Sequence, residues 1–258
     1  MRPLRRALVA LVLASLAACQ TVPYTGRSQL LILPEPAEWQ MGLDSYRQVL
    51  AKSRLSSDPV ATGQVRRVGS RIAEATGRRD YRWEFNLIED ARQVNAFCLP
   101  GGKVAVYTGI LPITRDDAGL AAVLAHEAAH AIARHGGERV SQGLLVQTGL
   151  VATQAALARN GPRTVQTVTA LLGAGATVGL LLPWSRSQES EADHLGLIYM
   201  AKAGYHPSAA RDLWVRMADA ARGRPRPPEF LATHPAEATR IRQIEAWIPE
   251  ALRYYQPR

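Results

Sequence analysis

The chain has 258 residues, of which 47% are hydrophobic and 21% charged, and its formal net charge is +9. This composition is close to the globular average, so it excludes wholesale disorder, collagen and coiled coil. Two cysteines exclude a disulfide scaffold and a four-cysteine zinc finger. The positive charge is spread along the chain, without a basic helix or an arginine–aromatic motif, so we expect a solvated basic surface and no nucleic-acid partner.

The first 18 residues have the pattern of a secretory signal. Residues 1–6 are basic, and residues 7–18 are an apolar run that is too short for a permanent membrane span. Small residues directly precede Cys19, which resembles a bacterial lipobox, so we expect residues 1–18 to be a lipoprotein signal peptide and Cys19 to carry the lipid. Gln20 then favours the outer membrane, facing the periplasm, by analogy with enterobacterial sorting. An ordinary signal peptide with an incidental cysteine is the alternative.

Residues 19–35 contain proline, glycine and polar residues and are predicted to be a tether, and residues 36–258 are predicted to form one mostly helical α+β domain. Helical periodicity and capping residues predict helices over 39–50, 58–77, 116–135, 138–160, 163–182, 186–202, 207–223 and from 235 onward. A small antiparallel sheet is predicted, with strands over 81–87, 94–99 and 104–108, the last two joined as a hairpin.

The chemistry is concentrated in the predicted helix over 116–135, which contains the motif H-E-x-x-H at residues 126–130. His126 and His130 are four residues apart, about 40° apart on one helix face, so both imidazoles can reach one zinc ion. Glu127 lies about 100° round the helix from His126, where it can touch a water on the metal rather than the metal itself. This position suits a general base.

Zinc in a catalytic site takes three protein ligands and keeps one position open for water. The extended pattern H-E-x-x-H-x-x-G-x-x-H is excluded, because Gly136 stands where its third histidine would be. The run E-S-E-A-D at residues 189–193 is the better source of the third ligand. Glu189 and Asp193 share a helix face, so Glu189 could bind the metal while Asp193 hydrogen-bonds a ligand imidazole. Spacing alone does not exclude Glu191.

Four further short motifs accompany the two metal-binding runs: Asn95-Ala96-Phe97, Leu99-Pro100-Gly101-Gly102, Ser185-Arg186 and Thr233-His234-Pro235. Taken together, the motifs resemble the HtpX-like and CAAX-prenyl-protease family of gluzincin metallopeptidases, and within it the periplasmic lipoprotein branch. The resemblance covers about residues 35–250. It implies a zincin-like core with one Zn²⁺ per chain, held by His126, His130 and Glu189, with Asp193 as the carboxylate that orients a ligand.

Two more groups of residues gain candidate roles. Asn95, Ala96 and Phe97 would form an edge strand that binds substrate as an added strand, as in other zinc peptidases; a plain internal strand is the alternative. The resemblance places His234 over the active site, where it would stabilise an oxyanion or cap the zinc in a latent form. A histidine at a helix start without any role is the third interpretation. Arg240 is a candidate to orient His234.

Residues 165–182 are uncharged, which makes this segment marginal for a membrane span. A helical hairpin that is buried or covers the site is favoured over membrane contact.

These observations predict a hydrolase: a zinc-dependent endopeptidase in which Glu127 activates water and His234 assists catalysis. The resemblance implies that it degrades misfolded or misassembled envelope proteins, attaches to the membrane through its N-terminal lipid and meets the machinery that assembles outer-membrane proteins. A chaperone-like protein that binds unfolded clients and seldom cleaves them is the alternative. The intact Glu127 argues against a purely non-catalytic protein.

Overall fold

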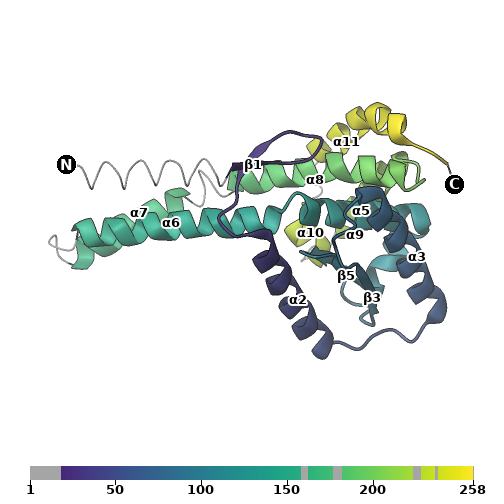
Figure 1. Ribbon diagram of the computed structural model, residues 1–258, viewed down its shortest axis with the longest axis horizontal. Helices are drawn as coiled ribbons and strands as arrows, with labels where there is room; N and C mark the ends of the chain where they lie inside the picture. The colour runs from purple at the N-terminus through teal and green to yellow at the C-terminus, as the bar shows by residue number, and fades with distance from the viewer. Residues whose placement is uncertain (1–18, 158–161, 177–181, 223–227, 236–237, 258) are drawn as a thin grey trace. The chain divides into compact units, whose positions relative to one another are not determined.

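The computed structural model describes residues 19–157, 162–176, 182–222, 228–235 and 238–257, and Figure 1 shows their helices and strands. Residues 1–18, the predicted signal peptide, lie outside the described residues. The chain divides into two compact units: unit 1 comprises Met1–Pro34 and Arg134–Gln188, and unit 2 comprises Glu35–Ala133 and Glu189–Arg258. The structure therefore groups residues 134–188 with the N-terminal segment rather than with the rest of the predicted domain.

Within residues 19–35, the segment predicted to be a tether, the N-terminal part of unit 1 forms a small hairpin. Strands β1 (Cys19–Thr21) and β2 (Ser28–Leu30) pair antiparallel. Gly26 has a φ of 66°, in the left-handed region that favours glycine, and lies in the turn between the two strands. Val22 and Leu31 are buried beside the hairpin, and this burial explains why the segment is ordered.

Unit 1 continues with helix α6 (His135–Leu157) and helix α7 (Pro162–Ala176), which pack side by side (Figure 1). A partly buried ion pair joins the β1–β2 hairpin to the start of α6. Arg27 donates two hydrogen bonds of 2.8 Å to the carboxylate of Glu138, and Glu138 accepts another of 2.7 Å from Gln188. Such a bidentate, fully satisfied pair fixes the packing of its elements.

Unit 2 contains a three-stranded sheet in the order β3-β5-β4. Strands β4 (Ala96–Leu99) and β5 (Lys103–Tyr107) form the predicted antiparallel hairpin, turned by Gly101 and Gly102 at φ of 82° and 81°. Strand β3 (Glu84–Ile88) pairs with β5 in parallel, so the sheet is mixed. Strand periodicity does not reveal which strands pair, so it could not predict the parallel pairing of β3 with β5.

Two helices with clear sequence signals cover this sheet region. Helix α2 (Glu35–Ala51) buries Tyr46, whose hydroxyl donates a 2.9 Å hydrogen bond to the carbonyl of Val104 in β5. Helix α3 (Pro59–Thr76) begins at the N-cap Asp58, whose side chain accepts from two backbone N–H groups, and ends at Gly77. Both ends of α3 agree with the prediction, since an aspartate cap and a left-handed glycine are local signals.

The remaining elements of unit 2 are mostly helical, and together they confirm the predicted α+β class. They are η1 (Thr108–Ile110), α4 (Leu111–Thr114), α5 (Asp117–Ile132), the later part of α8 (Leu182–Lys202), α9 (Ser208–Ala221), α10 (Glu229–Thr233), α11 (Ala238–Ala251) and η3 (Leu252–Tyr254). None of the helices in the described part of the chain has the length and hydropathy needed to cross a bilayer.

Candidate metal centre

Helix α5 presents the H-E-x-x-H motif from inside unit 2. Asp116 caps its N-terminus by accepting a 2.8 Å hydrogen bond from the backbone of Gly119. Every residue of α5 from Gly119 onward is buried, so the helix is held rigidly on all sides. The helix ends at Ile132 rather than at the predicted residue 135, because Arg134 takes a left-handed conformation with a φ of 56°.

One turn of α5 brings two imidazole nitrogens together. The Nε2 atoms of His126 and His130 lie 3.1 Å apart. Both side chains are almost fully buried. Two Nε2 atoms at this distance cannot both carry a proton. The arrangement therefore suits two unprotonated nitrogens whose lone pairs face one cation.

Helix α8 supplies a carboxylate to the same point. Glu189 places Oε2 at 3.4 Å from Nε2 of His126 and Oε1 at 3.3 Å from Nε2 of His130. Gly196 lies seven residues later, on the same face of α8. A Cβ on Gly196 would lie only 3.2 Å from the backbone nitrogen of His126, so this glycine permits the close approach of α8 to α5.

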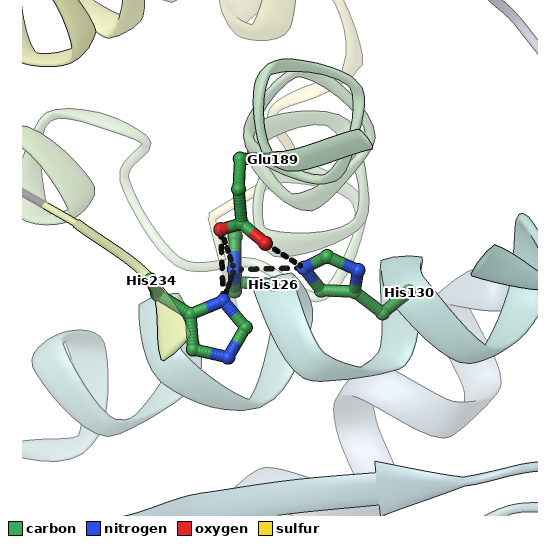
Figure 2. Close-up of side chains that lie close together, drawn as sticks. All are labelled: His126, His130, Glu189 and His234. Atoms are coloured by element: carbon green, nitrogen blue, oxygen red, sulfur yellow. Dashed lines mark hydrogen bonds and ion pairs between the residues drawn. The ribbon is translucent and has the colours of Figure 1, made fainter. Parts of the chain in front are cut away.

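His234 follows α10 directly and completes the cluster. Its Nδ1 lies 2.8 Å from Oε2 of Glu189 and 3.2 Å from Nε2 of His126. Figure 2 shows the side chains of α5, α8 and the segment after α10 pointing toward one another. One donor atom from each of the four residues lies within 4.8 Å of the others.

This donor set fits a zinc ion. In a tetrahedral zinc site with bonds of about 2.0–2.2 Å, the ligand atoms lie about 3.4 Å apart. The separations among His126, His130 and Glu189, and between His126 and His234, are 3.1–3.4 Å, and the Glu189–His234 separation is shorter at 2.8 Å. Three imidazoles and one carboxylate are the ligand types that zinc prefers. Without a cation, several acceptor atoms would face each other in a buried site, so the chemistry of the set calls for one.

Glu127 lies beside the donor set and outside it. Its carboxyl is buried, and burial raises its pKa, while the nearby His234 and His126 act in the opposite direction. The Oε1 atom of Glu127 lies 3.4 Å from Nε2 of His234. A buried carboxyl with a raised pKa beside such a donor set is suited to accept and return a proton.

An ion pair between Asp193 and Arg240 lies next to His126. Asp193 places Oδ1 at 3.0 Å from Nδ1 of His126, and Arg240 donates from Nε and Nη2 to the two Asp193 oxygens at 2.6 and 2.8 Å. Although burial opposes ionisation of Asp193, the Arg240 charge outweighs it and lowers the pKa of the carboxyl. Asp193 is therefore placed to accept a proton from Nδ1 of His126, an arrangement that would leave Nε2 unprotonated.

The guanidinium of Arg240 is itself fixed by three further contacts. Its Cζ lies 3.5 Å from the centre of the Trp214 ring, and Nη2 lies 3.4 Å from Oε2 of Glu189. Nη1 donates to the carbonyl of Pro235 at 3.2 Å. The sequence suggested that Arg240 orients His234, whereas its strongest bonds are to Asp193. Trp214 was not foreseen, because no local pattern marks an aromatic residue as the platform of a distant arginine.

The other candidate residues have these positions. Among the described residues, the donor cluster contains Glu189 and not Glu191, which is buried on the same helix. Ala96 and Phe97 belong to β4, with Asn95 just before it, and β4 is an edge of the three-stranded sheet. Cys19 is the first residue of β1.

A comparison with known proteins agrees with this geometry. The model of peptidase family M48 matches residues 59–248, a span that includes all four clustered donors. The chain belongs to peptidase family M48. The predicted family resemblance is thereby confirmed, and with it the prediction of a metallopeptidase at the level of the family.

Some relatives of this M48 protein are named as mitochondrial metalloendopeptidases, and others as beta-barrel assembly-enhancing proteases. It is 42% identical to the mitochondrial metalloendopeptidase OMA1 of Schizosaccharomyces pombe over 89% of this chain and 66% of the relative. It is 28% identical to the beta-barrel assembly-enhancing protease of Escherichia coli over 93% of this chain and 52% of the relative. A putative beta-barrel assembly-enhancing protease of Vibrio cholerae is 31% identical over 83% of this chain and 44% of the relative. The M48 chain thus spans between 44% and 66% of the length of these three proteins.

Proposed function

We propose that this M48 chain is a zinc-dependent endopeptidase whose ion is held by His126, His130 and Glu189. The observation that carries the proposal is the convergence of these three side chains beside a buried Glu127. A bound zinc ion would act as a Lewis acid and lower the pKa of water toward about 7. Asp193 would hold the imidazole of His126 in the tautomer that leaves Nε2 unprotonated.

Glu127 would move the proton. Its raised pKa brings the carboxylate closer to the basicity needed to take a proton from water. The same carboxyl would then return the proton to the leaving amine nitrogen when the peptide C–N bond breaks. Burial keeps bulk water from competing for this proton.

The strand β4 would bind substrate along its free edge. Asn95 accepts a hydrogen bond from Tyr107 of β5, so the alternate backbone groups of β4 face away from β5. A backbone hydrogen bond from Cys98 is one of the interactions that act on the Glu127 carboxyl, so this free edge runs past the proposed base. Pairing through backbone groups would select extended chains rather than a particular sequence, which suits unfolded clients.

One short segment occupies both of the positions that a substrate would use. Phe230 in α10 donates its backbone N–H to the carbonyl of Val94, just before β4, at 3.0 Å. Four residues later, His234 puts Nδ1 into the donor cluster. This geometry supports the interpretation of His234 as a cap on the zinc in a resting form, rather than as an oxyanion donor. Cleavage would then require residues 230–234 to move away.

For the cellular setting, we propose a lipid on Cys19, attachment to the outer membrane on the periplasmic side, and misfolded or misassembled envelope proteins as substrates. The relatives named beta-barrel assembly-enhancing protease support this setting and contact with the outer-membrane assembly machinery. Other relatives have mitochondrial names, so fractionation of the cell envelope is the test of the proposed compartment.

Cleavage of an unfolded protein tests the proposal. Purified chain should cut reduced casein, lose that activity on treatment with a chelator and regain it with one equivalent of zinc. A chaperone-like binder would instead hold the unfolded protein and leave it intact with or without zinc, and that result would overturn the peptidase proposal.

A further inference from the structure

The helical hairpin of α6 and α7 in unit 1 has an apolar surface that its own folding does not use. Four residues of α6 recur at helical spacing and are half-buried, so we infer that they face α7: Val146, Leu150, Thr153 and Leu157. Val140, Leu144 and Val151 lie on the opposite side of α6 and are exposed, Val151 to 58%. We call these three residues the α6 stripe.

Helix α7 also has large aliphatic side chains that are exposed. Leu171 is 68% exposed and Leu172 is 48% exposed. On α6, the three exposed aliphatic side chains share one face, in place of the charged residues usual on a solvated helix, and such a face marks a surface that binds something.

The charged residues in the sequence around α6 and α7 indicate which kind of partner this surface binds. Between Glu138 and Glu189 the sequence has no aspartate or glutamate, and its only charged residues are arginines, at positions 139, 159, 163 and 186. Residues 140–157 of α6 are uncharged, and the nearest charged residues on either side of them in the sequence, Arg139 and Arg159, are cationic, so the α6 stripe complements an anionic lipid surface.

The position of the α6–α7 hairpin in unit 1 agrees with a lipid surface as the partner. Unit 1 contains both the hairpin and β1, which begins at Cys19, the proposed site of the lipid. The backbone N–H of Ile32, after β2, donates a 2.9 Å hydrogen bond to the hydroxyl of Ser141 at the base of the hairpin. A lipid at Cys19 would therefore hold this same unit at a bilayer.

We propose that the α6–α7 hairpin docks in the headgroup region of an anionic bilayer, with the α6 stripe among the upper acyl chains. This inference goes beyond the proposed peptidase activity and draws on it only for the lipid at Cys19. Both helices satisfy their backbone hydrogen bonds internally, so they can enter the interface without exposing peptide groups to lipid. The hairpin lies on the membrane and does not cross it.

A probe on the stripe tests the proposal in the full lipidated chain. Leu144→Cys is labelled with an environment-sensitive fluorophore, and Val60→Cys serves as the matched control, because Val60 is an 80% exposed valine in unit 2. Cys98 is buried and burial raises the pKa of its thiol, so it should not react. Both proteins are placed on phosphatidylethanolamine vesicles with and without phosphatidylglycerol.

We expect the Leu144 probe to shift to the blue and to be quenched several-fold more strongly than the Val60 probe by a quencher attached to lipid chains. The effect should be larger with phosphatidylglycerol, and Val151→Cys, on the same stripe, should behave like Leu144→Cys. A Leu144 probe as open to aqueous iodide as the Val60 probe would overturn the proposal. So would a shift that follows protein concentration or added unfolded casein instead of lipid, because the stripe would then bind a second copy or a client. Palmitate labelling, measured separately, reports whether the lipid itself is present.

Discussion

Arg240 and Asp193 form a buried bidentate ion pair, with Nε–Oδ2 and Nη2–Oδ1 distances of 2.6 and 2.8 Å. The pair lies directly behind the proposed ligand His126. We expect Arg240→Gln to weaken zinc binding about 10–100-fold, because Asp193 would lose the charge that keeps it ionised. Arg240→Lys should recover only part of this affinity, since an ammonium cannot bind both oxygens in a fork. Zinc titration against a competing chelator measures the effect, with Arg242→Gln as the exposed control. An unchanged affinity in Arg240→Gln would remove this residue from the support of the site.

Glu127→Gln separates proton transfer from metal binding. The amide keeps the shape of the side chain but cannot accept the proton from water, so we expect zinc content to stay normal and kcat to fall by about 10²–10⁴. Metal analysis and casein cleavage on the same sample check both parts. Normal turnover in this variant would contradict the mechanism, and loss of zinc would mean that Glu127 is a ligand.

Glu189 and Glu191 are matched carboxylates on one helix, and only Glu189 belongs to the donor cluster. Glu189→Gln should lose zinc, because a neutral amide is a much weaker ligand for the ion than a carboxylate. Glu191→Gln should retain it. Zinc per folded molecule is the measurement, with circular dichroism to confirm that both variants fold. The reverse pattern would mean that the helix is rotated about its axis relative to this structure.

His234→Ala tests whether this side chain blocks or assists catalysis. Because its Nδ1 lies within the donor cluster, we expect its removal to open the fourth position and to raise kcat per zinc-loaded molecule. His206→Ala, at an exposed histidine bonded to Ser208, is the control. A fall of about 10²–10³ in rate would instead indicate an oxyanion donor. An unchanged rate would exclude both roles.

Cys19→Ser tests the proposed anchor. Only a thiol can accept the lipid, so the variant should no longer incorporate labelled palmitate and should appear as an uncleaved precursor or as a form released from the membrane. Cys98→Ser, at the other cysteine of the chain, is the control and should keep its label. Palmitate incorporation that persists in Cys19→Ser would show that the lipobox interpretation is wrong.

The sequence by itself determined the features that depend on neighbours within about one helical turn or one tight turn of chain. The placement of His126, Glu127 and His130 on one capped helix follows from spacing alone. Helix α3 was bounded correctly by Asp58 and Gly77, because capping residues act on the backbone groups next to them.

The tertiary structure decided everything that depends on which segments meet. The parallel pairing of β3 with β5, and the folding of residues 19–30 into a hairpin, rest on contacts between elements that strand and turn patterns do not encode. The approach of Glu189 rather than Glu191 to the histidines is set by how α8 packs against α5, where Gly196 leaves room for the backbone of His126. The position of His234 in the donor cluster likewise depends on α10, which is held at Val94 by a backbone hydrogen bond across more than a hundred residues of chain. Helix rotation and loop docking are set by the packing of the whole core, so no local pattern could have fixed them.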